Sequence, residues 1–172
     1  MEPRGNLVLL GFMGTGKSAV GRRVAALAGA PFFEMDAELE QRAGKPISRI
    51  FSEDGEPAFR DLESQLAQEW GRKEGTVISC GGGVALREEN LRALGANGLL
   101  VCLTARPEII LERTARSKKR PLLAGEDPER KIRDLLAARA PAYAKIPVQI
   151  DTSDEGLAEL AARLLALWKT PA

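Results

Sequence analysis

Short apolar runs alternate along the chain with amphipathic segments of helical period. The runs Asn6–Phe12, Thr76–Cys80 and Leu99–Thr104 are predominantly apolar, which is typical of strands buried on both faces of a sheet. Two shorter runs, Phe32–Met35 and Val148–Ile150, predict further strands. Because helical segments separate these strands, the pattern predicts an α/β fold in which helices cover both faces of a parallel sheet.

The predicted helices have apolar side chains three or four positions apart, or a start or stop signal at one end. They cover Lys17–Leu27, Asp36–Ala43, Glu56–Trp70, a segment that opens at Pro107, a segment from Asp127-Pro128 to about Ala140, and a C-terminal segment. In the first helix, Val20, Val24 and Leu27 define the face expected to be buried. In the last, the buried face is predicted to comprise Leu157, Leu160, Ala161, Leu164, Leu165 and Trp168.

Composition narrows the classes of function. The chain has 172 residues with 25 Lys+Arg and 24 Asp+Glu, a length that suits one domain over residues 1–172. Balanced charge argues against a nucleic-acid partner held by phosphate neutralisation. The chain has no histidine, which excludes Ser-His-Asp and Cys-His catalysis and histidine-containing zinc sites. Acid–base chemistry is therefore left to carboxylates, Lys, Tyr or bound water.

Cysteine usage and the N-terminus bear on location. The two cysteines, Cys80 and Cys102, lie in strand-like runs, so we expect buried reduced thiols of the kind found in the cytoplasm. The N-terminus has no basic segment leading into a long apolar stretch, as a signal peptide would. No apolar run approaches the roughly 20 residues that span a membrane. We therefore expect a cytoplasmic protein with no membrane partner.

The most specific chemical signal is Gly11-Phe12-Met13-Gly14-Thr15-Gly16-Lys17-Ser18, which fits the phosphate-binding loop pattern. It lies between the first predicted strand and the first predicted helix, where backbone N–H groups and the helix N-terminus can converge on phosphate oxygens. Lys17 is expected to reach the β- and γ-phosphates, and the Ser18 hydroxyl to bind Mg²⁺. The alternative is a chance glycine-rich turn. Pattern and position together favour nucleotide binding.

Two carboxylates, Glu34 and Asp36, come at the end of the second predicted strand. Strand alternation points both to the same side, at the edge of a parallel sheet where ligands bind. In one interpretation they serve Mg²⁺, through its waters, and a substrate hydroxyl. In the other, Asp36 only caps the helix that follows. Their spacing leaves both interpretations open.

The third strand of the chain runs into Gly81-Gly82-Gly83. This segment is either a flexible turn or a place where the backbone approaches a ligand closely, because side chains there would obstruct it. Its position at the carboxyl end of a predicted parallel strand favours the second interpretation.

Three arginines stand out among the many basic residues: Arg60, Arg120 and Arg139. A planar guanidinium suits a carboxylate or phosphate better than a lysine does. Arg120 ends the basic run Lys118-Lys119-Arg120 within Ser117–Glu126, a segment whose charge, Gly and Pro are typical of a mobile loop. The run is either a solvated loop or a lid that closes positive charge over phosphates.

Taken together, these residues predict a Mg²⁺–nucleotide enzyme, a kinase for a small, anionic acceptor that carries a hydroxyl. The sequence also resembles the shikimate kinases, in the nucleoside-monophosphate-kinase-like branch of P-loop proteins, from Leu7 to about Thr152. The segments that carry the resemblance are Gly11–Ser18, Asp36, Glu40-Gln41-Arg42, Gly44, Ile50-Phe51, Asp54-Gly55-Glu56, Phe59-Arg60, Gly81-Gly82-Gly83, Arg120-Pro121-Leu122-Leu123-Ala124-Gly125, Arg139-Ala140-Pro141 and Tyr143.

The resemblance implies a three-layer α/β/α fold with a five-stranded parallel sheet. It further implies a small helical subdomain for the substrate, over about residues 34–62, and a mobile lid over about residues 113–127. The implied reaction transfers the γ-phosphoryl of ATP to the 3-hydroxyl of shikimate, with Mg²⁺, in the route to chorismate and the aromatic amino acids. A monomer is expected.

The resemblance also implies roles for individual residues. Asp36 would hold the acceptor hydroxyl and take its proton, while Lys17 and Arg120 would stabilise charge on the phosphoryl group. The residues implied to bind ATP are Gly14, Thr15, Gly16, Lys17, Ser18, Ala19, Arg113 and Arg120. Those implied to bind shikimate are Asp36, Arg60, Gly82 and Arg139, and those implied to hold Mg²⁺ are Ser18 and, through water, Glu34.

The chain departs from the family pattern in two places. Glu34 stands where the family has the first Asp of Asp-x-Asp, which bears on Mg²⁺ because that ion demands near-ideal octahedral geometry. The segment Asp151–Gly156 lacks the basic residue and the proline expected near adenine, so the choice of nucleotide base stays open. Two alternative functions are kept beside the kinase for shikimate: a gluconate kinase-like enzyme of the same branch, and a shikimate-kinase-like binding protein without turnover, to which Glu34 points.

Overall fold

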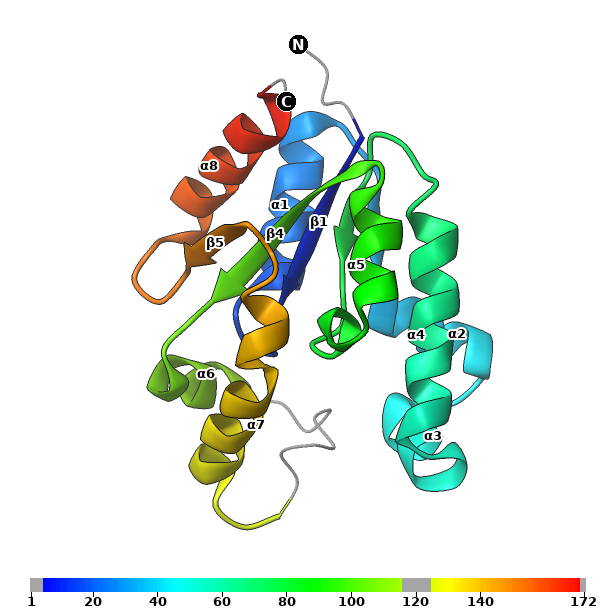
Figure 1. Cartoon of the computed structure of the whole chain (residues 1–172). Coiled ribbons are helices and arrows are strands. Elements are labelled where there is room, and N and C mark those ends of the chain that lie inside the picture. The colour runs from blue at the N-terminus through cyan, green and yellow to red at the C-terminus, as the bar shows by residue number, and fades with distance from the viewer. Residues whose placement is uncertain (1–4, 116–124, 171–172) are drawn as a thin grey trace.

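Five parallel strands form one sheet in the order β2-β3-β1-β4-β5, and Figure 1 labels β1, β4 and β5 of it. The structure, a computed structural model, describes residues 5–115 and 125–170. The strands are β1 (Asn6–Gly11), β2 (Phe32–Glu34), β3 (Val77–Ser79), β4 (Gly98–Thr104) and β5 (Val148–Asp151). The predicted α/β class, with its five parallel strands, is confirmed.

Helices cover both faces of the sheet. Helices α1 and α8 pack against each other on one face, and α4, α5 and α7 lie on the other (Figure 1). The helices are α1 (Lys17–Ala28), α2 (Met35–Ala43), α3 (Ile47–Asp54), α4 (Glu56–Trp70), the 3₁₀ turn η1 (Val84–Leu86), α5 (Glu88–Gly95), α6 (Pro107–Thr114), α7 (Pro128–Tyr143) and α8 (Leu157–Lys169). None of the helices in the described ranges has the length and apolar content needed to cross a bilayer.

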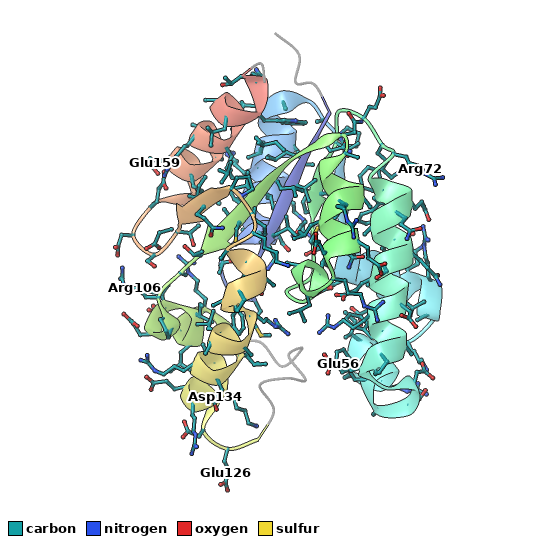
Figure 2. All side chains as sticks on the ribbon, viewed as in Figure 1. Glu56, Arg72, Arg106, Glu126, Asp134 and Glu159 are labelled. Carbon is teal, nitrogen blue, oxygen red and sulfur yellow. The ribbon has the colours of Figure 1, made fainter. Side chains whose placement is uncertain are left out.

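Strand alternation divides the core into two clusters. In β1, Leu7 and Leu9 pack with α1 and α8, whereas Val8 and Leu10 pack with the helices of the other face. All four side chains are completely buried, because a central parallel strand is covered on both sides. Charged side chains such as Arg72, Asp134 and Glu159 point away from the sheet, as Figure 2 shows.

The carboxyl ends of β1, β2 and β3 meet at one edge of the sheet, since the register pairs Leu9 with Ser79 and Ser79 with Glu34. Helices α2 and α3 follow β2 at this edge, and both contact α4 (Figure 1). The loops that leave these three strands therefore face one another, and ligands bind at such an edge in open parallel sheets.

The expectation that Glu34 and Asp36 alternate along one strand is wrong. Strand β2 ends at Glu34, and α2 begins at Met35, which places Asp36 in the first helical turn. Asp36 is not the helix cap either, because Glu34 occupies that position and no side chain bonds there. The structure therefore excludes the helix cap for Asp36, whereas the interpretation in which Glu34 and Asp36 serve Mg²⁺ and a substrate hydroxyl stays a prediction.

Several helix boundaries also differ from the prediction. Helix α7 continues past Ala140 and through Pro141 to Tyr143, whose buried side chain anchors its last turn. Leu27 and Leu157, expected in buried faces, are about half exposed at the ends of their helices. Helices α3 and α5 were not predicted, because each is short and mostly polar. The N-cap Asp127 and the first-turn prolines of α6 and α7 are confirmed, and Cys80 and Cys102 are buried free thiols.

The expected lid over about residues 113–127 has its central part, 116–124, outside the described residues, and Arg120 lies there.

Candidate active site

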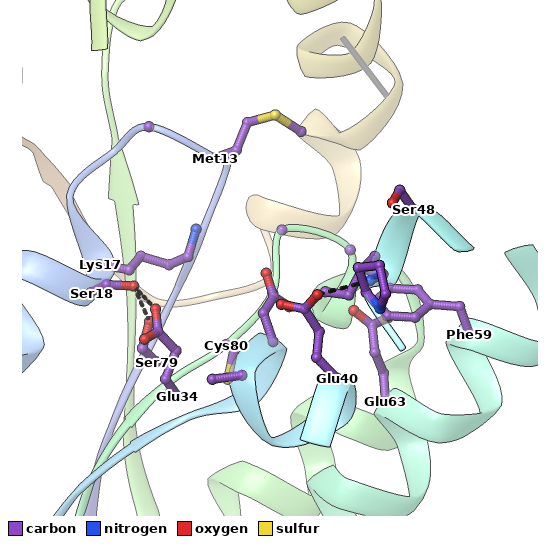
Figure 3. Close-up of a pocket in the computed structure, with 18 of the residues that line it drawn as sticks. Met13, Lys17, Ser18, Glu34, Glu40, Ser48, Phe59, Glu63, Ser79 and Cys80 are labelled. Atoms are coloured by element: carbon purple, nitrogen blue, oxygen red, sulfur yellow. Dashed lines mark hydrogen bonds between the residues drawn. The ribbon is translucent and has the colours of Figure 1, made fainter. Parts of the chain in front are cut away.

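A cavity of about 690 Å³ opens at the carboxyl edge of the sheet. Its walls come from the loop after β1, the end of β2, helices α2, α3, α4 and α7, and the glycines after β3. In Figure 3, Lys17, Ser18, Glu34 and Ser79 lie on one side of this cavity, and Glu63 lies with Phe59 on the other. Except for Thr15, the described residues that the sequence predicts for nucleotide binding and those that it predicts for acceptor binding therefore line one cavity.

The loop between β1 and α1 presents an open helix end to the cavity. Gly16 caps α1 with a left-handed backbone (φ 98°), and no side chain bonds to the first helical N–H groups. The backbone of Gly14 is also left-handed (φ 76°), a conformation that glycine adopts without steric cost. The N–H groups at the start of α1, which belong to Lys17, Ser18 and Ala19, thus form an anion-binding end with a favourable helix dipole.

Lys17 folds back over the same loop. Its Nζ donates to the carbonyl oxygens of Gly11 (2.7 Å) and Phe12 (2.9 Å), and the side chain is largely buried. A lysine held this way carries its positive charge at the centre of the loop, beside the open helix end. Thr15 stabilises the same turn by donating its hydroxyl to the Phe12 carbonyl (2.7 Å).

Ser18 and Glu34 are in direct contact, with the Ser18 hydroxyl donating to Glu34 Oε1. The Ser79 hydroxyl lies 3.5 Å from that of Ser18, and Arg22 Nη2 donates to Glu34 Oε2 (2.6 Å), as the close-up in Figure 3 shows for the two serines. Hydroxyl and carboxylate oxygens are hard donors of the type that Mg²⁺ prefers, so this group fits that ion. Sequence reasoning missed Arg22, although it lies one helical turn after Ser18.

The three glycines after β3 each approach a different charged side chain. A Cβ on Gly81 would lie 2.8 Å from Asp36 Oδ1, and one on Gly82 would lie 2.9 Å from Arg139 Nη1. A Cβ on Gly83 would overlap the Arg60 guanidinium. The triple glycine is therefore a place of close approach, and it brings together residues from α2, α4 and α7.

Arg60 and Glu63 form a buried ion pair on one face of α4. Arg60 Nη1 donates to Glu63 Oε2 (2.6 Å), and Arg60 Nη2 donates to Glu56 Oε1 (3.1 Å). Burial raises the pKa of the Glu63 carboxyl to about 7, Arg60 opposes that rise, and the neighbouring Asp36 adds to it. Glu63 was not singled out from the sequence, yet its position three residues after Arg60 on a predicted helix was a usable signal.

Three buried polar atoms of this cluster have no hydrogen-bond partner within the described part of the chain: Arg60 Nε, Glu63 Oε1 and Arg139 Nη1. All three side chains line the cavity. Because buried polar groups are normally paired, the two guanidinium nitrogens indicate a place for a ligand that accepts from their N–H groups.

Arg139 packs against an aromatic ring, and a hydrogen bond ties the helix that carries it to the glycine segment. Its guanidinium lies 5.5 Å from the centre of the Phe12 ring, so the electron-rich ring face stabilises the positive charge. The Tyr143 hydroxyl, one turn later on α7, donates to the Gly82 carbonyl (2.6 Å) and so ties the helix to the glycine segment. Burial raises the pKa of Tyr143 to about 12, so it remains a donor at neutral pH.

Arg113 lies at the opposite end of the cavity, on α6. It donates to the Gly14 carbonyl (3.2 Å), to the Thr152 hydroxyl (3.0 Å) and to the Thr152 carbonyl (2.7 Å). Arg113 thus joins the phosphate-binding loop to the end of β5. Of the residues predicted for the site, Arg120 alone falls outside the described residues.

Fold and site together define a class of protein: a P-loop α/β kinase whose phosphate loop faces a pocket with buried guanidinium groups. Sequence comparisons with known proteins match one family of this class. The sequence model of the shikimate kinase family matches residues 13–169. The chain is 45% identical to the shikimate kinase of Desulforudis audaxviator, covering 95% of this chain and 86% of that one. It is 43% identical to the shikimate kinase of Caldanaerobacter subterraneus, covering 95% of each.

Comparison with solved structures also finds shikimate kinases. A shikimate kinase from Acinetobacter baumannii in complex with shikimate superposes with a TM-score of 0.91 at 38% identity, over 96% of this chain and 93% of that one. A gluconokinase from Sinorhizobium meliloti gives a TM-score of 0.63 at 22% identity, over 95% of this chain and 91% of that one, which shows a shared fold alone. The chain belongs to the shikimate kinase family.

The raised pKa of Glu63 predicts a pH dependence of stability. The folded protein binds the proton of the Glu63 carboxyl more tightly than the unfolded chain does, where the pKa of a Glu is about 4.3. Protonated Glu63 therefore contributes fully to the free energy of unfolding below that pH. It is lost as pH rises through about 7. The free energy of unfolding should fall from about pH 5 to about pH 7 and level off above about pH 8, with a slope of at most about 1.4 kcal/mol per pH unit for one proton.

Urea unfolding of wild type and Glu63→Gln across that range measures this effect, and the Gln variant should give a flatter profile. Glu69→Gln, on the same helix, is the control. Arg42 lowers the pKa of Glu69, so that variant should shift stability by a constant amount. Parallel wild-type and Glu63→Gln profiles would contradict the prediction.

Proposed function

We propose that this chain transfers the γ-phosphoryl group of ATP to the 3-hydroxyl of shikimate, giving shikimate 3-phosphate and ADP, a step toward chorismate and the aromatic amino acids. One observation carries the proposal: the open phosphate loop and two buried arginines with unpartnered atoms nearby line the same cavity. Shikimate has the carboxylate that the arginines lack and the hydroxyl that a phosphoryl acceptor needs. Family membership adds independent support.

At the acceptor end, Arg60 and Arg139 hold the carboxylate of shikimate, since a guanidinium forms paired, charge-assisted hydrogen bonds with it. The backbone at Gly82 lies against the ring, and Asp36 holds the reacting hydroxyl. This arrangement is supported by the close approaches of Asp36 and Arg139 to adjacent glycines. Helices α2 and α3, with the start of α4, would act as the substrate subdomain over about residues 34–62.

At the nucleotide end, the phosphates of ATP accept from the backbone of the loop and the start of α1. The residues proposed to contact ATP are Gly14, Thr15, Gly16, Lys17, Ser18, Ala19 and Arg113, with Arg120 from the proposed lid over about residues 113–127. The charge of Lys17 lies where negative charge grows on the transferred group, and stabilising that charge is the main protein contribution to phosphoryl transfer.

Mg²⁺ bound with ATP would neutralise charge on the phosphate oxygens. Ser18 would be its direct protein ligand, and Glu34 would accept from its waters. The contact between these two side chains supports this pairing. Glu34 is one methylene longer than the family's aspartate, and Arg22 donates to the oxygen that does not contact Ser18.

The remaining chemistry belongs to Asp36, which orients the 3-hydroxyl toward the terminal phosphorus. A carboxylate is a weak base, and it suffices because the alcohol needs alignment more than early deprotonation. Proton transfer to Asp36 Oδ1 then follows bond formation to phosphorus. We further propose that the protein acts as a monomer in the cytoplasm, where its two free thiols would persist.

The direct test measures ADP release with ATP and Mg²⁺ in the presence of shikimate, gluconate or neither. We expect ADP release that depends on shikimate, with gluconate at background. Lys17→Met should lower kcat by at least about 100-fold while binding shikimate normally, because it removes charge that acts on the transition state. Turnover of gluconate but not shikimate would indicate a different small-metabolite kinase. Binding of both substrates without ADP release would indicate a binding protein.

A second prediction concerns Gly83→Ala. The added Cβ would overlap the Arg60 guanidinium and displace it, while the ordinary φ of Gly83 (−98°) adds no backbone strain. The KM for shikimate should rise at least about tenfold, equivalent to about 1.4 kcal/mol, with the KM for ATP unchanged. Gly95→Ala on α5, away from the cavity, is the control and should leave both constants as in wild type. An unchanged KM for shikimate in Gly83→Ala would remove Arg60 from the acceptor site.

A further inference from the structure

Thr152, the residue after β5, connects three parts of the nucleotide end of the site. Its side chain is almost completely buried. Its hydroxyl lies 2.8 Å from the Thr15 carbonyl oxygen and 3.1 Å from that of Thr104, and its N–H donates to the same Thr104 carbonyl (2.8 Å). Arg113 donates to both its hydroxyl and its carbonyl oxygen.

The hydroxyl has a single hydrogen, which it donates mainly to Thr15 because that contact is the shorter one. Its lone pair accepts from Arg113 Nη1. The result is a directed chain from Arg113 through Thr152 to Thr15. Hydrogen bonds of this kind are stronger in a buried setting than in water, and a charged donor at the start strengthens them.

This chain determines the orientation of one peptide group in the phosphate loop. A trans peptide is planar, so the C=O of Thr15 and the N–H of Gly16 point in opposite directions. Thr15 is completely buried and its carbonyl is bound by Thr152, whereas Gly16 lines the cavity. Binding the carbonyl on the inner side therefore turns the Gly16 N–H toward the cavity, where phosphate oxygens would accept from it.

We infer that Thr152 is a positioning residue for the nucleotide: its hydroxyl orients the Thr15–Gly16 peptide toward phosphate and holds the Arg113 guanidinium at the end of the cavity. The inference rests on the proposed function insofar as the ligand is ATP. It gives Thr152 a role at the phosphate loop, whereas the sequence placed its segment, Asp151–Gly156, only near the nucleotide base.

The test compares Thr152→Val, Thr152→Ser and Thr104→Val. Valine keeps the shape of threonine and removes the hydroxyl, whereas serine retains it. Thr104 ends the neighbouring strand, and its own hydroxyl makes a long contact with the Ile150 carbonyl (3.4 Å), so Thr104→Val is a matched control. Calorimetry of Mg²⁺–ADP binding and steady-state kinetics are measured for each variant, with circular dichroism to verify folding.

Thr152→Val should weaken ADP binding and raise the KM for ATP about tenfold, the cost of a lost buried hydrogen bond to a charged donor. The KM for shikimate should stay within about twofold, and Thr152→Ser and Thr104→Val should stay within about threefold of wild type in ADP affinity. Wild-type ADP affinity in a folded Thr152→Val, or an equal loss in Thr152→Ser, would overturn the inference.

If Thr152→Val does not fold, Thr152→Cys replaces it, because cysteine is similar in size and its thiol is only a weak donor. Thr152→Cys should then weaken ADP binding in the same direction. Wild-type ADP affinity in that variant would overturn the inference.

Failure of the proposed function is distinguishable from failure of this inference. A wild-type protein that binds ADP but does not turn over shikimate contradicts the proposed function and leaves the Thr152 comparison intact, because calorimetry requires no acceptor. A wild-type protein that binds no ADP contradicts both.

Discussion

The segment Gly81–Gly83 carries no side chains at the point where charged groups from three helices converge. Asp36, Arg60 and Arg139 each come so close to one of these glycines that a Cβ would meet them, and Glu63 shares the approach to the first. The whole acceptor end of the cavity depends on this constraint. Any other residue there would push one of the charged groups away from the others.

The charges at that edge are arranged for a ligand. Burial raises the pKa of Glu63, and the neighbouring Asp36 adds to that rise. Arg60 and Arg139 compensate, but each retains a buried nitrogen without a partner in the described part of the chain. An acid whose carboxylate accepts from both would complete the group, and its hydroxyl would then fall toward Asp36. The phosphate loop follows β1, the strand next to β3, so a nucleotide bound there would face this ligand from the adjacent strand.

Much of this arrangement could be predicted from the sequence, because the strongest signals are local. The strand–loop–helix pattern around Lys17 requires only neighbours in the chain, and the same holds for the N-cap at Asp127. The close approach at the triple glycine was offered as one of two interpretations, since its cause lies in contacts from distant helices. Strand alternation failed for Asp36 because the chain turns into α2 one residue earlier than expected.

What could not be predicted depends on contacts between residues far apart in the sequence. Glu63 and Thr152 belong to no phosphate motif, and their importance appears only once Arg60 or Thr15 is beside them. The pairing of Glu34 with Arg22 has the same origin. Such roles depend on tertiary contacts, which local patterns in a single sequence do not predict.

A crystal structure with shikimate and ADP tests the central claim most directly. The account predicts that the shikimate carboxylate lies within about 3.2 Å of guanidinium nitrogens of both Arg60 and Arg139, with its 3-hydroxyl at Asp36 and facing the phosphate loop. A shikimate molecule bound away from the triple glycine, or one whose carboxylate points at Lys17 instead of the two arginines, would contradict it.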